Sequence, residues 1–173
     1  MAGRYLVTGA AGFIASRVIE LLAEKGHAVT GIDNLNDAYD VRLKEYRLKR
    51  LRTLPGFKFY QDDICDIPAL EAIFDAHGPF DGVINLAARA GVRASTENPW
   101  AFVDTNTTGT LNLLEMCRKG GSAKFILAST SSIYGANPPY PTPEDADSNF
   151  PLQPYAASKK GAEAMCHAHH HLY

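Results

Sequence analysis

Short apolar runs alternate along the chain with longer segments of helical length. Five runs have the length and composition of buried β-strands, and they lie at residues 5–8, 28–32, 57–60, 81–86 and 124–128. The segments between them are long enough to form helices, and they lie at 12–25, 40–53, 68–76 and 99–118. Strands that alternate with helices predict an α/β fold in which a parallel, doubly wound sheet carries helices on both faces.

Two of these helices predict which side chains face the sheet. In the first helix one apolar stripe is formed by Ile14, Val18, Leu21 and Leu22. In the helix at 40–53 we expect Leu43, Tyr46 and Leu48 to turn toward the sheet. That helix is also basic, as membrane-surface and nucleic-acid-binding helices are. Because the whole chain carries a net charge of −2, a solvated helix is the favoured interpretation.

The composition changes after residue 128. Six of the ten prolines lie at 136–154, which predicts an irregular surface loop, and a last helix follows at 155–173. No C-cap glycine or closing strand follows this helix, as expected of the N-terminal portion of a longer chain. We expect residues 1–173 to form one domain in which the loop and the last helix border the active site.

Charge and cysteine content narrow the class of protein. A net charge of −2 provides no broad positive field, so we expect neither a nucleic-acid nor a membrane partner. The three cysteines lie far apart and form no C-x-x-C motif, which favours reduced thiols in a cytoplasmic protein. We expect no secretion signal and no membrane span, because no apolar run approaches about 20 residues. We also expect no metal site, because the consecutive residues His169–His171 point in different directions on a helix.

A glycine-rich turn lies between the first strand and the first helix. Its sequence is Thr8-Gly9-Ala-Ala-Gly12-Phe13-Ile14-Ala15, with the spacing G-x-x-G-x-x-A. Glycine allows the tight turn and the close approach of backbone N–H groups that a pyrophosphate requires. An ordinary glycine turn before a helix is the alternative. Ala15 occupies a position where a small residue suffices for close packing of helix and strand.

Acidic residues follow the second and third strands. Asp33 lies about 20 residues beyond the glycine turn, where a carboxylate binds a ribose 2′-hydroxyl and repels a 2′-phosphate, which favours NAD over NADP. A turn aspartate before Asn34 is an equally good interpretation. Asp63 and Ile64 end the third strand at the same edge and are candidates to meet the adenine, while Asp62 is an equally good candidate for a helix cap.

A tyrosine and a lysine begin the last helix. Tyr155 and Lys159 are four residues apart, so their side chains share one face of the helix. A lysine ammonium stabilises a neighbouring phenolate, which can then accept a proton from a sugar hydroxyl. Taken alone, the pair is more often a chance feature of a helix. It follows a hydroxyl-rich strand end at 129–132, where Thr130 or a neighbouring serine could bridge substrate and Tyr155, although a serine/threonine turn explains Ser129 and Ser132 individually.

These motifs together resemble the extended short-chain dehydrogenase/reductase family. The segments are TGAAGFI, DNLNDAYDVRLK, LAARAGVRASTENP, STSSIYG and YAASKKGAE, which cover nearly the whole chain. Within the family they look most like UDP-glucuronate 4-epimerases. The resemblance implies a Rossmann-type, NAD-binding domain whose C-terminal substrate domain is largely absent, because family members are nearly twice as long.

The resemblance also implies roles for individual residues. The catalytic trio falls on Thr130, Tyr155 and Lys159. Contacts to NAD fall on Gly9, Gly12, Phe13, Ile14, Asp33, Asn34, Asp63, Ile64, Leu86, Ala87, Ala88, Asn106, Tyr155 and Lys159. Contacts to the nucleotide sugar fall on Arg93, Ser131 and Ser132. Two positions depart from the family pattern: Ala15 replaces a glycine, and Asn85 stands where relatives often carry histidine.

The implied activity is 4-epimerisation of a UDP-sugar, by transient oxidation and re-reduction at C4 with NAD. UDP-glucuronate and UDP-galacturonate are the expected substrates. Related dehydratases carry an aspartate and a glutamate where this chain has Ser131 and Ser132, so elimination of water is not expected. A UDP-glucose-type epimerase or related sugar-nucleotide enzyme, and a truncated NAD-binding module without catalysis, are the alternatives. The resemblance further implies a homodimer that pairs through the helices at 99–118 and 155–173.

Overall fold

The computed structural model describes residues 2–122 and 124–173, and it contains two compact units. One unit comprises Met1–Ala87 and Asn112–Ala128, and we call it the sheet unit. The other comprises Ala88–Leu111 and Ser129–Tyr173, and we call it the helical unit.

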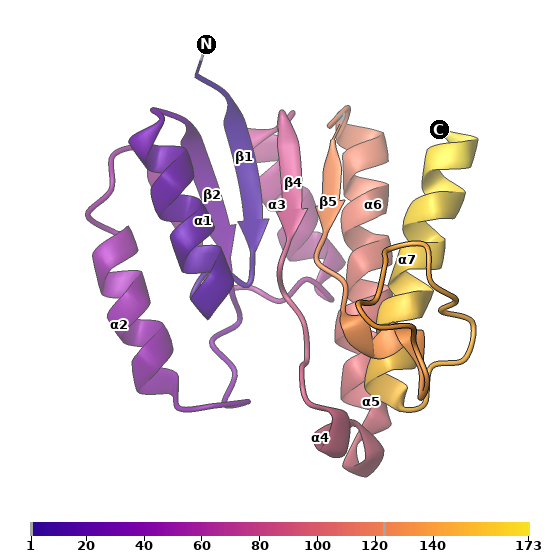
Figure 1. The fold of residues 1–173 in the computed structure, drawn as a ribbon. Coiled ribbons are helices and arrows are strands. Elements are labelled where there is room, and N and C mark those ends of the chain that lie inside the picture. Colours follow the sequence, from indigo (N-terminus) through magenta and orange to yellow (C-terminus); the bar gives the residue numbers. More distant parts are fainter. Residues whose placement is uncertain (1, 123) are drawn as a thin grey trace. The chain divides into compact units, whose positions relative to one another are not determined.

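The sheet unit contains five parallel strands in the order β3-β2-β1-β4-β5 (Figure 1). Their bounds are β1 Arg4–Thr8, β2 Ala28–Ile32, β3 Phe57–Tyr60, β4 Gly82–Asn85 and β5 Phe125–Leu127. Because successive side chains of a strand point to opposite faces, Leu6 and Val7 of β1 enter two different hydrophobic clusters. Both are fully buried, so the central strand is covered on both faces.

Helices cover both faces of this sheet. Their bounds are α1 Phe13–Glu24, α2 Val41–Leu51, α3 Ile67–His77 and α6 Gly109–Gly120. One cluster joins Val7 and Val29 to Ile19 of α1 and Leu51 of α2. The other cluster joins strand residues to α3 and to the part of α6 within this unit (Figure 1). The predicted doubly wound α/β fold is therefore confirmed.

The helical unit is built around one long helix, α7 (Pro154–Leu172). The chain first forms α4 (Val92–Glu97), α5 (Pro99–Phe102) and the π-helix η1 (Val103–Thr108). The 3-10 helix η2 (Ser131–Tyr134) follows later in the sequence. All four segments contact α7. Residues 136–153 contain no helix or strand.

The structure corrects the expected helix at 99–118. This segment is α5, the π-helix η1 and α6 in succession, and the short helix α4 before it was not predicted. A π-helix has hydrogen bonds between residues five apart and not four, and apolar periodicity over a short segment does not reveal this difference.

The predicted buried faces of α1 and α2 were partly wrong. Leu43 is 50% exposed and Tyr46 is 63% exposed, while Lys44, Leu48 and Leu51 are buried. On α1, Ile14 and Leu21 are exposed, and Ala15 and Ile19 are buried in their place. The face of α2 differs because polar groups at the end of β2 accept Lys44, so a charged residue takes an inward position.

Two findings concern the described residues as a group. Between residues 2 and 173, apart from position 123, no helix is both long and apolar enough to cross a membrane. Within the same described ranges, no group of three or more histidine, cysteine and acidic side chains is arranged to hold a metal ion.

Candidate active site

The glycine turn after β1 lies close to the chain that follows β4. A Cβ atom at Gly9 would lie 2.9 Å from the backbone nitrogen of Ala87 and 2.9 Å from the carbonyl oxygen of Leu86. The φ angle of Gly9 is +66°, which L side chains rarely adopt. At Gly12 a Cβ atom would lie 2.8 Å from the carbonyl oxygen of Gly9. Neither position can accept a side chain without displacing backbone.

The N-terminus of α1 presents backbone donors. Gly12 is its N-cap residue, and no side chain caps this end of the helix. Its first turn contains no acidic residue. Within the described part of the chain, the N–H groups of Phe13 and Ile14 have no hydrogen-bond acceptor. Free donors at the positive end of a helix dipole suit a phosphate group, so the turn fits a dinucleotide.

A side-chain hydrogen bond joins β1 to β4 beneath this turn. The Thr8 hydroxyl donates to Asn85 Oδ1 at 2.6 Å and accepts from the N–H of Ala87 at 3.1 Å. Thr8 and Asn85 are both buried. The asparagine that departs from the family pattern therefore fixes the distance between the strand ends that carry Gly9 and Ala87.

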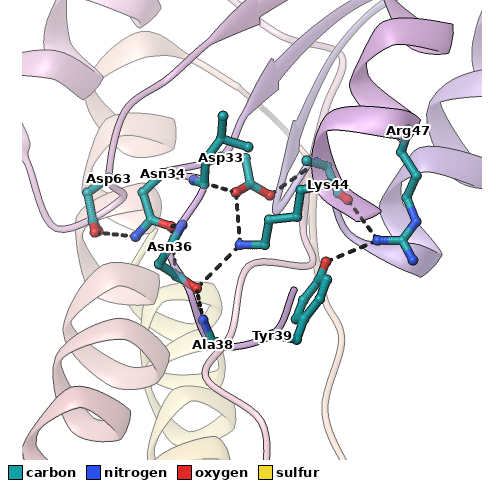
Figure 2. A network of polar contacts seen from close by, with 10 residues as sticks. Asp33, Asn34, Asn36, Ala38, Tyr39, Lys44, Arg47 and Asp63 are labelled. Atoms are coloured by element: carbon teal, nitrogen blue, oxygen red, sulfur yellow. Dashed lines mark hydrogen bonds and ion pairs between the residues drawn. The ribbon is translucent and has the colours of Figure 1, made fainter. Parts of the chain in front are cut away.

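Asp33 is the centre of a polar network that Figure 2 shows at the end of β2. Its Oδ2 accepts the N–H of Ala11 at 3.1 Å, and its Oδ1 accepts the N–H of Leu35 at 2.8 Å. Lys44 Nζ lies 3.4 Å from Oδ1. The bond to Leu35 is the contact of a turn aspartate, and the bond to Ala11 ties the carboxylate to the glycine turn. The turn-aspartate interpretation of Asp33 is thus confirmed, and binding of a ribose hydroxyl stays a prediction.

Asn34 and Asp63 connect the ends of β2 and β3. Asn34 Nδ2 donates to Asp63 Oδ2 at 2.7 Å (Figure 2). Ile64 is buried, and its carbonyl oxygen accepts a hydrogen bond from Asn112 Nδ2 at 3.1 Å. The cap of α3 is Asp66, which accepts the N–H of Ala69, and not Asp62 as one interpretation had it.

Lys44 and Arg47 of α2 were not predicted from the sequence to be functional residues. Arg47 Nη1 donates to the carbonyl oxygen of Ala11 at 3.2 Å and to the Tyr39 hydroxyl at 3.1 Å. Lys44 lies at i, i+4 and i+7 spacing with the buried Leu48 and Leu51. That spacing is a detectable signal, but a charged residue on an inward helical stripe is usually assigned to solvent.

In the helical unit, Tyr155 and Lys159 lie in the first two turns of α7. Tyr155 is partly buried, and its ring meets the Phe102 ring edge to face at 6.1 Å between centroids. Lys159 is 2% exposed. Across the described residues, no group accepts a hydrogen bond from its ammonium. Burial lowers the pKa of Lys159, and the opposing effects of Cys166 and Glu163 are smaller.

Thr130 precedes the 3-10 helix η2. Its Oγ1 accepts the N–H of Ser132 at 3.2 Å and donates to the Ser132 hydroxyl at 3.3 Å, so it is the N-cap of this short helix. Ser131 is exposed and Ser132 is partly buried. A serine/threonine turn is therefore present, but Thr130 provides its side chain, and not Ser129 or Ser132 as predicted.

Asn106 joins three segments of the helical unit. Its Oδ1 accepts the N–H of Arg89 at 2.8 Å, and its Nδ2 donates to the Arg89 carbonyl and to Ser158 Oγ. The side chain is 1% exposed. Ser158 is one residue before Lys159, and its carbonyl accepts the Thr107 hydroxyl at 2.9 Å. Both amide hydrogens of Asn106 are used inside the protein, which fixes the chain at Arg89 against α7.

The candidate residues fall into two groups. The sheet unit holds Gly9, Gly12, Phe13, Ile14, Asp33, Asn34, Asp63, Ile64, Leu86 and Ala87. The helical unit holds Ala88, Arg93, Asn106, Thr130, Ser131, Ser132, Tyr155 and Lys159. Within the helical unit, Ala88 and Arg93 are exposed.

Comparison with known proteins confirms the resemblance to nucleotide-sugar epimerases. A UDP-glucuronate 4-epimerase of Thermodesulfobacterium geofontis is 58% identical over 99% of this chain and 52% of its own length. The structure of UDP-glucuronic acid 4-epimerase from Bacillus cereus, in complex with UDP-glucuronic acid and NAD, has a TM-score of 0.87. It is 35% identical over 98% of this chain and 53% of that one.

A UDP-glucose 4-epimerase of Thermotoga maritima, solved with UDP-glucose, gives a TM-score of 0.86 and 37% identity over 98% of this chain and 52% of that one. The chain thus spans about half the length of the relatives it matches. A family model described as GDP-mannose 4,6 dehydratase matches residues 6–173, and the chain belongs to this family.

Proposed function

We propose that this protein is an NAD-dependent nucleotide-sugar 4-epimerase that interconverts UDP-glucuronate and UDP-galacturonate. The observation that carries the proposal is Lys159, one turn after Tyr155 on α7, a residue only 2% exposed whose ammonium has no acceptor in the described residues. A cation in this state is stabilised by polar groups from a ligand. The relatives described above act on UDP-glucuronate or UDP-glucose.

The sheet unit would hold the dinucleotide. The backbone donors at Phe13 and Ile14 would bind the pyrophosphate, and the tight turn at Gly9 and Gly12 would let it approach. Asp33 would accept the adenosine ribose hydroxyls. Asn34, Asp63 and Ile64 would border the adenine, and Leu86 and Ala87 would follow the dinucleotide along the end of β4. When bound, NAD supplies the reversible oxidation of the sugar at C4.

The helical unit would supply the proton chemistry. Tyr155 would take the proton of the sugar C4 hydroxyl and later return it, with the Thr130 hydroxyl as hydrogen-bonding partner of the substrate oxygen. The Lys159 ammonium would stabilise the phenolate and bind the nicotinamide ribose. Arg93, Ser131 and Ser132 would contact the nucleotide sugar. Because hydroxyl groups replace the carboxylates of dehydratases at these serines, the 4-keto sugar would be reduced again without loss of water.

Asn106 and Ala88 have different parts in this proposal. Both amide hydrogens of Asn106 are bonded to Arg89 and Ser158, so we assign it the positioning of the chain beside the cofactor and not a direct contact. Ala88 precedes this fixed segment, and its backbone would contact the dinucleotide.

The proposal is tested with the purified chain, whose length is first verified by intact mass. Calorimetry measures NAD⁺ binding, and chromatography measures conversion of UDP-glucuronate to UDP-galacturonate. We expect binding and conversion by the wild type, binding without conversion by Tyr155→Phe, and weakened binding by Asp33→Ala. Conversion that is unchanged in Tyr155→Phe would contradict the proposed chemistry.

A second candidate function follows from the chain's coverage of about half of its relatives. A dinucleotide-binding module without turnover would bind NAD⁺ but convert no UDP-sugar. The same two measurements separate this candidate from the enzyme. A UDP-glucose-type epimerase, as in the Thermotoga maritima relative, would convert UDP-glucose to UDP-galactose and leave UDP-glucuronate unchanged.

We also propose a homodimer and a cytoplasmic location. Trp100, Val103 and Met165 are apolar side chains exposed on α5, η1 and α7, the segments through which the family resemblance implies pairing. None of the three cysteines, all of which are described, forms a disulfide, as in a reducing compartment. Light scattering of the purified protein, and of Trp100→Ser as the weakened variant, tests the dimer. Cell fractionation tests the location.

A further inference from the structure

The side chain of Lys44 is buried beside the carboxylate that the proposed function assigns to the adenosine ribose. Lys44 Nζ lies 3.4 Å from Asp33 Oδ1, and each of the two side chains is 6% exposed. Asn36 Oδ1 provides its second acceptor at 3.3 Å (Figure 2). The ammonium also lies 5.2 Å from the centre of the Tyr39 ring. The lysine is therefore held by three groups.

The carboxylate of Asp33 is fixed independently of this lysine. Its two oxygens accept the backbone N–H groups of Ala11 and Leu35. The orientation of Asp33 therefore needs no cation. Lys44 chiefly changes the net charge that the Asp33 site presents to a bound ligand.

That charge decides how strongly a 2′-phosphate is repelled. A buried, unpaired carboxylate acts on an incoming phosphate through a medium of low dielectric constant, so the repulsion is large. A carboxylate paired with an ammonium at hydrogen-bonding distance acts as a dipole, whose potential falls off faster with distance. The usual inference from Asp33 to strict preference for NAD assumes that the carboxylate has no such partner.

We propose that Lys44 is a specificity-determining residue that partly neutralises Asp33 and so reduces the discrimination of this site against NADP. The inference rests on the proposed dinucleotide site. It adds that preference between NAD and NADP is set by the Asp33–Lys44 pair and not by Asp33 alone.

The experiment measures dissociation constants of NAD⁺ and NADP⁺ by calorimetry for wild type, Lys44→Met and Lys49→Met. Lys49 is the matched control, because it is an exposed lysine of the same helix and its removal lowers net charge equally. We expect the ratio of the NADP⁺ to the NAD⁺ dissociation constant to rise about tenfold in Lys44→Met, which corresponds to about 1.4 kcal/mol. In Lys49→Met the ratio should change less than about twofold.

A purely structural role of Lys44 gives a different result. If Lys44→Met weakened both dinucleotides equally and left the ratio unchanged, the proposal would be overturned. Circular dichroism at each protein concentration used verifies that the variant is folded, and Lys44→Arg, which keeps the cation, should retain the wild-type ratio.

Failure of the proposed function is recognisable separately. If the chain binds NAD⁺ but converts no UDP-sugar, the epimerase proposal is wrong. A raised ratio of the NADP⁺ to the NAD⁺ dissociation constant in Lys44→Met would still support the inference about Lys44. A chain that binds neither dinucleotide overturns both.

Discussion

Lys44 in the sheet unit and Lys159 in the helical unit are both buried, at 5% and 2% exposure, yet their surroundings differ. Lys44 has a carboxylate and an amide oxygen within hydrogen-bonding distance. Lys159 has neither among the described residues, and burial lowers its pKa. The difference indicates two uses of a buried cation. A paired lysine completes a preformed site, whereas an unpaired one is held by the rest of the fold at a cost in stability that a ligand can offset.

The largest expected effect concerns the proposed chemistry at Lys159. Lys159→Met removes the cation beside Tyr155, so we expect the rate of epimerisation to fall about 10³-fold, equivalent to about 4 kcal/mol of barrier. Rates of UDP-glucuronate conversion measure it. Lys160→Met, a change at the next residue with its partly exposed ammonium, is the control and should keep the rate within a few-fold. Equal losses in both variants would contradict the distinct role of Lys159.

The next largest effect is the loss of folding stability when the paired lysine, Lys44, is replaced. Lys44→Met leaves the buried carboxylate of Asp33 without its cation, so we expect the free energy of unfolding to fall by about 3 kcal/mol. Urea denaturation measures the change. In the double variant Asp33→Asn/Lys44→Met neither charge of this pair remains, and part of the loss should be recovered. A double variant with the summed losses of both single variants would show that the pair is not coupled.

For Lys159 we expect a stability change of the opposite sign. Lys159→Met removes a cation whose charged form is disfavoured by burial of its side chain, so the free energy of unfolding should rise by about 1 kcal/mol at neutral pH. The folded-state pKa lies below the ordinary value of 10.5, so the folded state releases the proton first. Wild-type stability should therefore rise with pH as the pH approaches 10.5, and the advantage of the variant should shrink. Urea denaturation at several pH values tests the sign, and an advantage that grows with pH would refute it.

The smallest effect concerns a buried group without charge. Burial raises the pKa of the Cys117 thiol from 9.0 to about 12. Between pH 9 and pH 12 the thiol of Cys117 ionises in the unfolded chain and stays neutral in the folded chain. This thiol therefore stabilises the fold below pH 9, and its contribution is lost as pH rises toward 12.

We expect the exposed Cys65 to react with a thiol reagent in the native protein and Cys117 only after unfolding. Equal rates for both would contradict the buried position.

The order of strands and helices was predictable because each strand is a short apolar run bounded by turn residues. The strands at 28–32 and 57–60 begin and end at the predicted residues. The glycine turn was predictable for a related reason, since Gly9 and Gly12 are needed where a Cβ atom would collide with backbone. Local sequence therefore determines these features.

The inward position of Lys44 and the π-helix at Val103–Thr108 were not predictable in the same way. Lys44 is buried because folding brings its ammonium next to Asp33 and Asn36, which lie eleven and eight residues earlier in the sequence. Asn106 depends on Arg89 and Ser158, which come together only after folding. The roles of Thr130, Tyr155 and Lys159 come from a resemblance and remain predictions, although the burial of Lys159 favours them.

The exposed side chains at the start of α1 offer a practical opportunity. Phe13 is 80% exposed and Ile14 is 62% exposed, while the groups suited to phosphate at these positions are main-chain N–H donors. Recognition through the backbone does not depend on the identity of these side chains, and the Phe13 ring has one further contact, with the Arg47 guanidinium carbon 5.8 Å from its centre. An engineer can therefore replace both residues by hydrophilic ones to reduce aggregation in storage, and the donors at the tip of the helix will stay where they are.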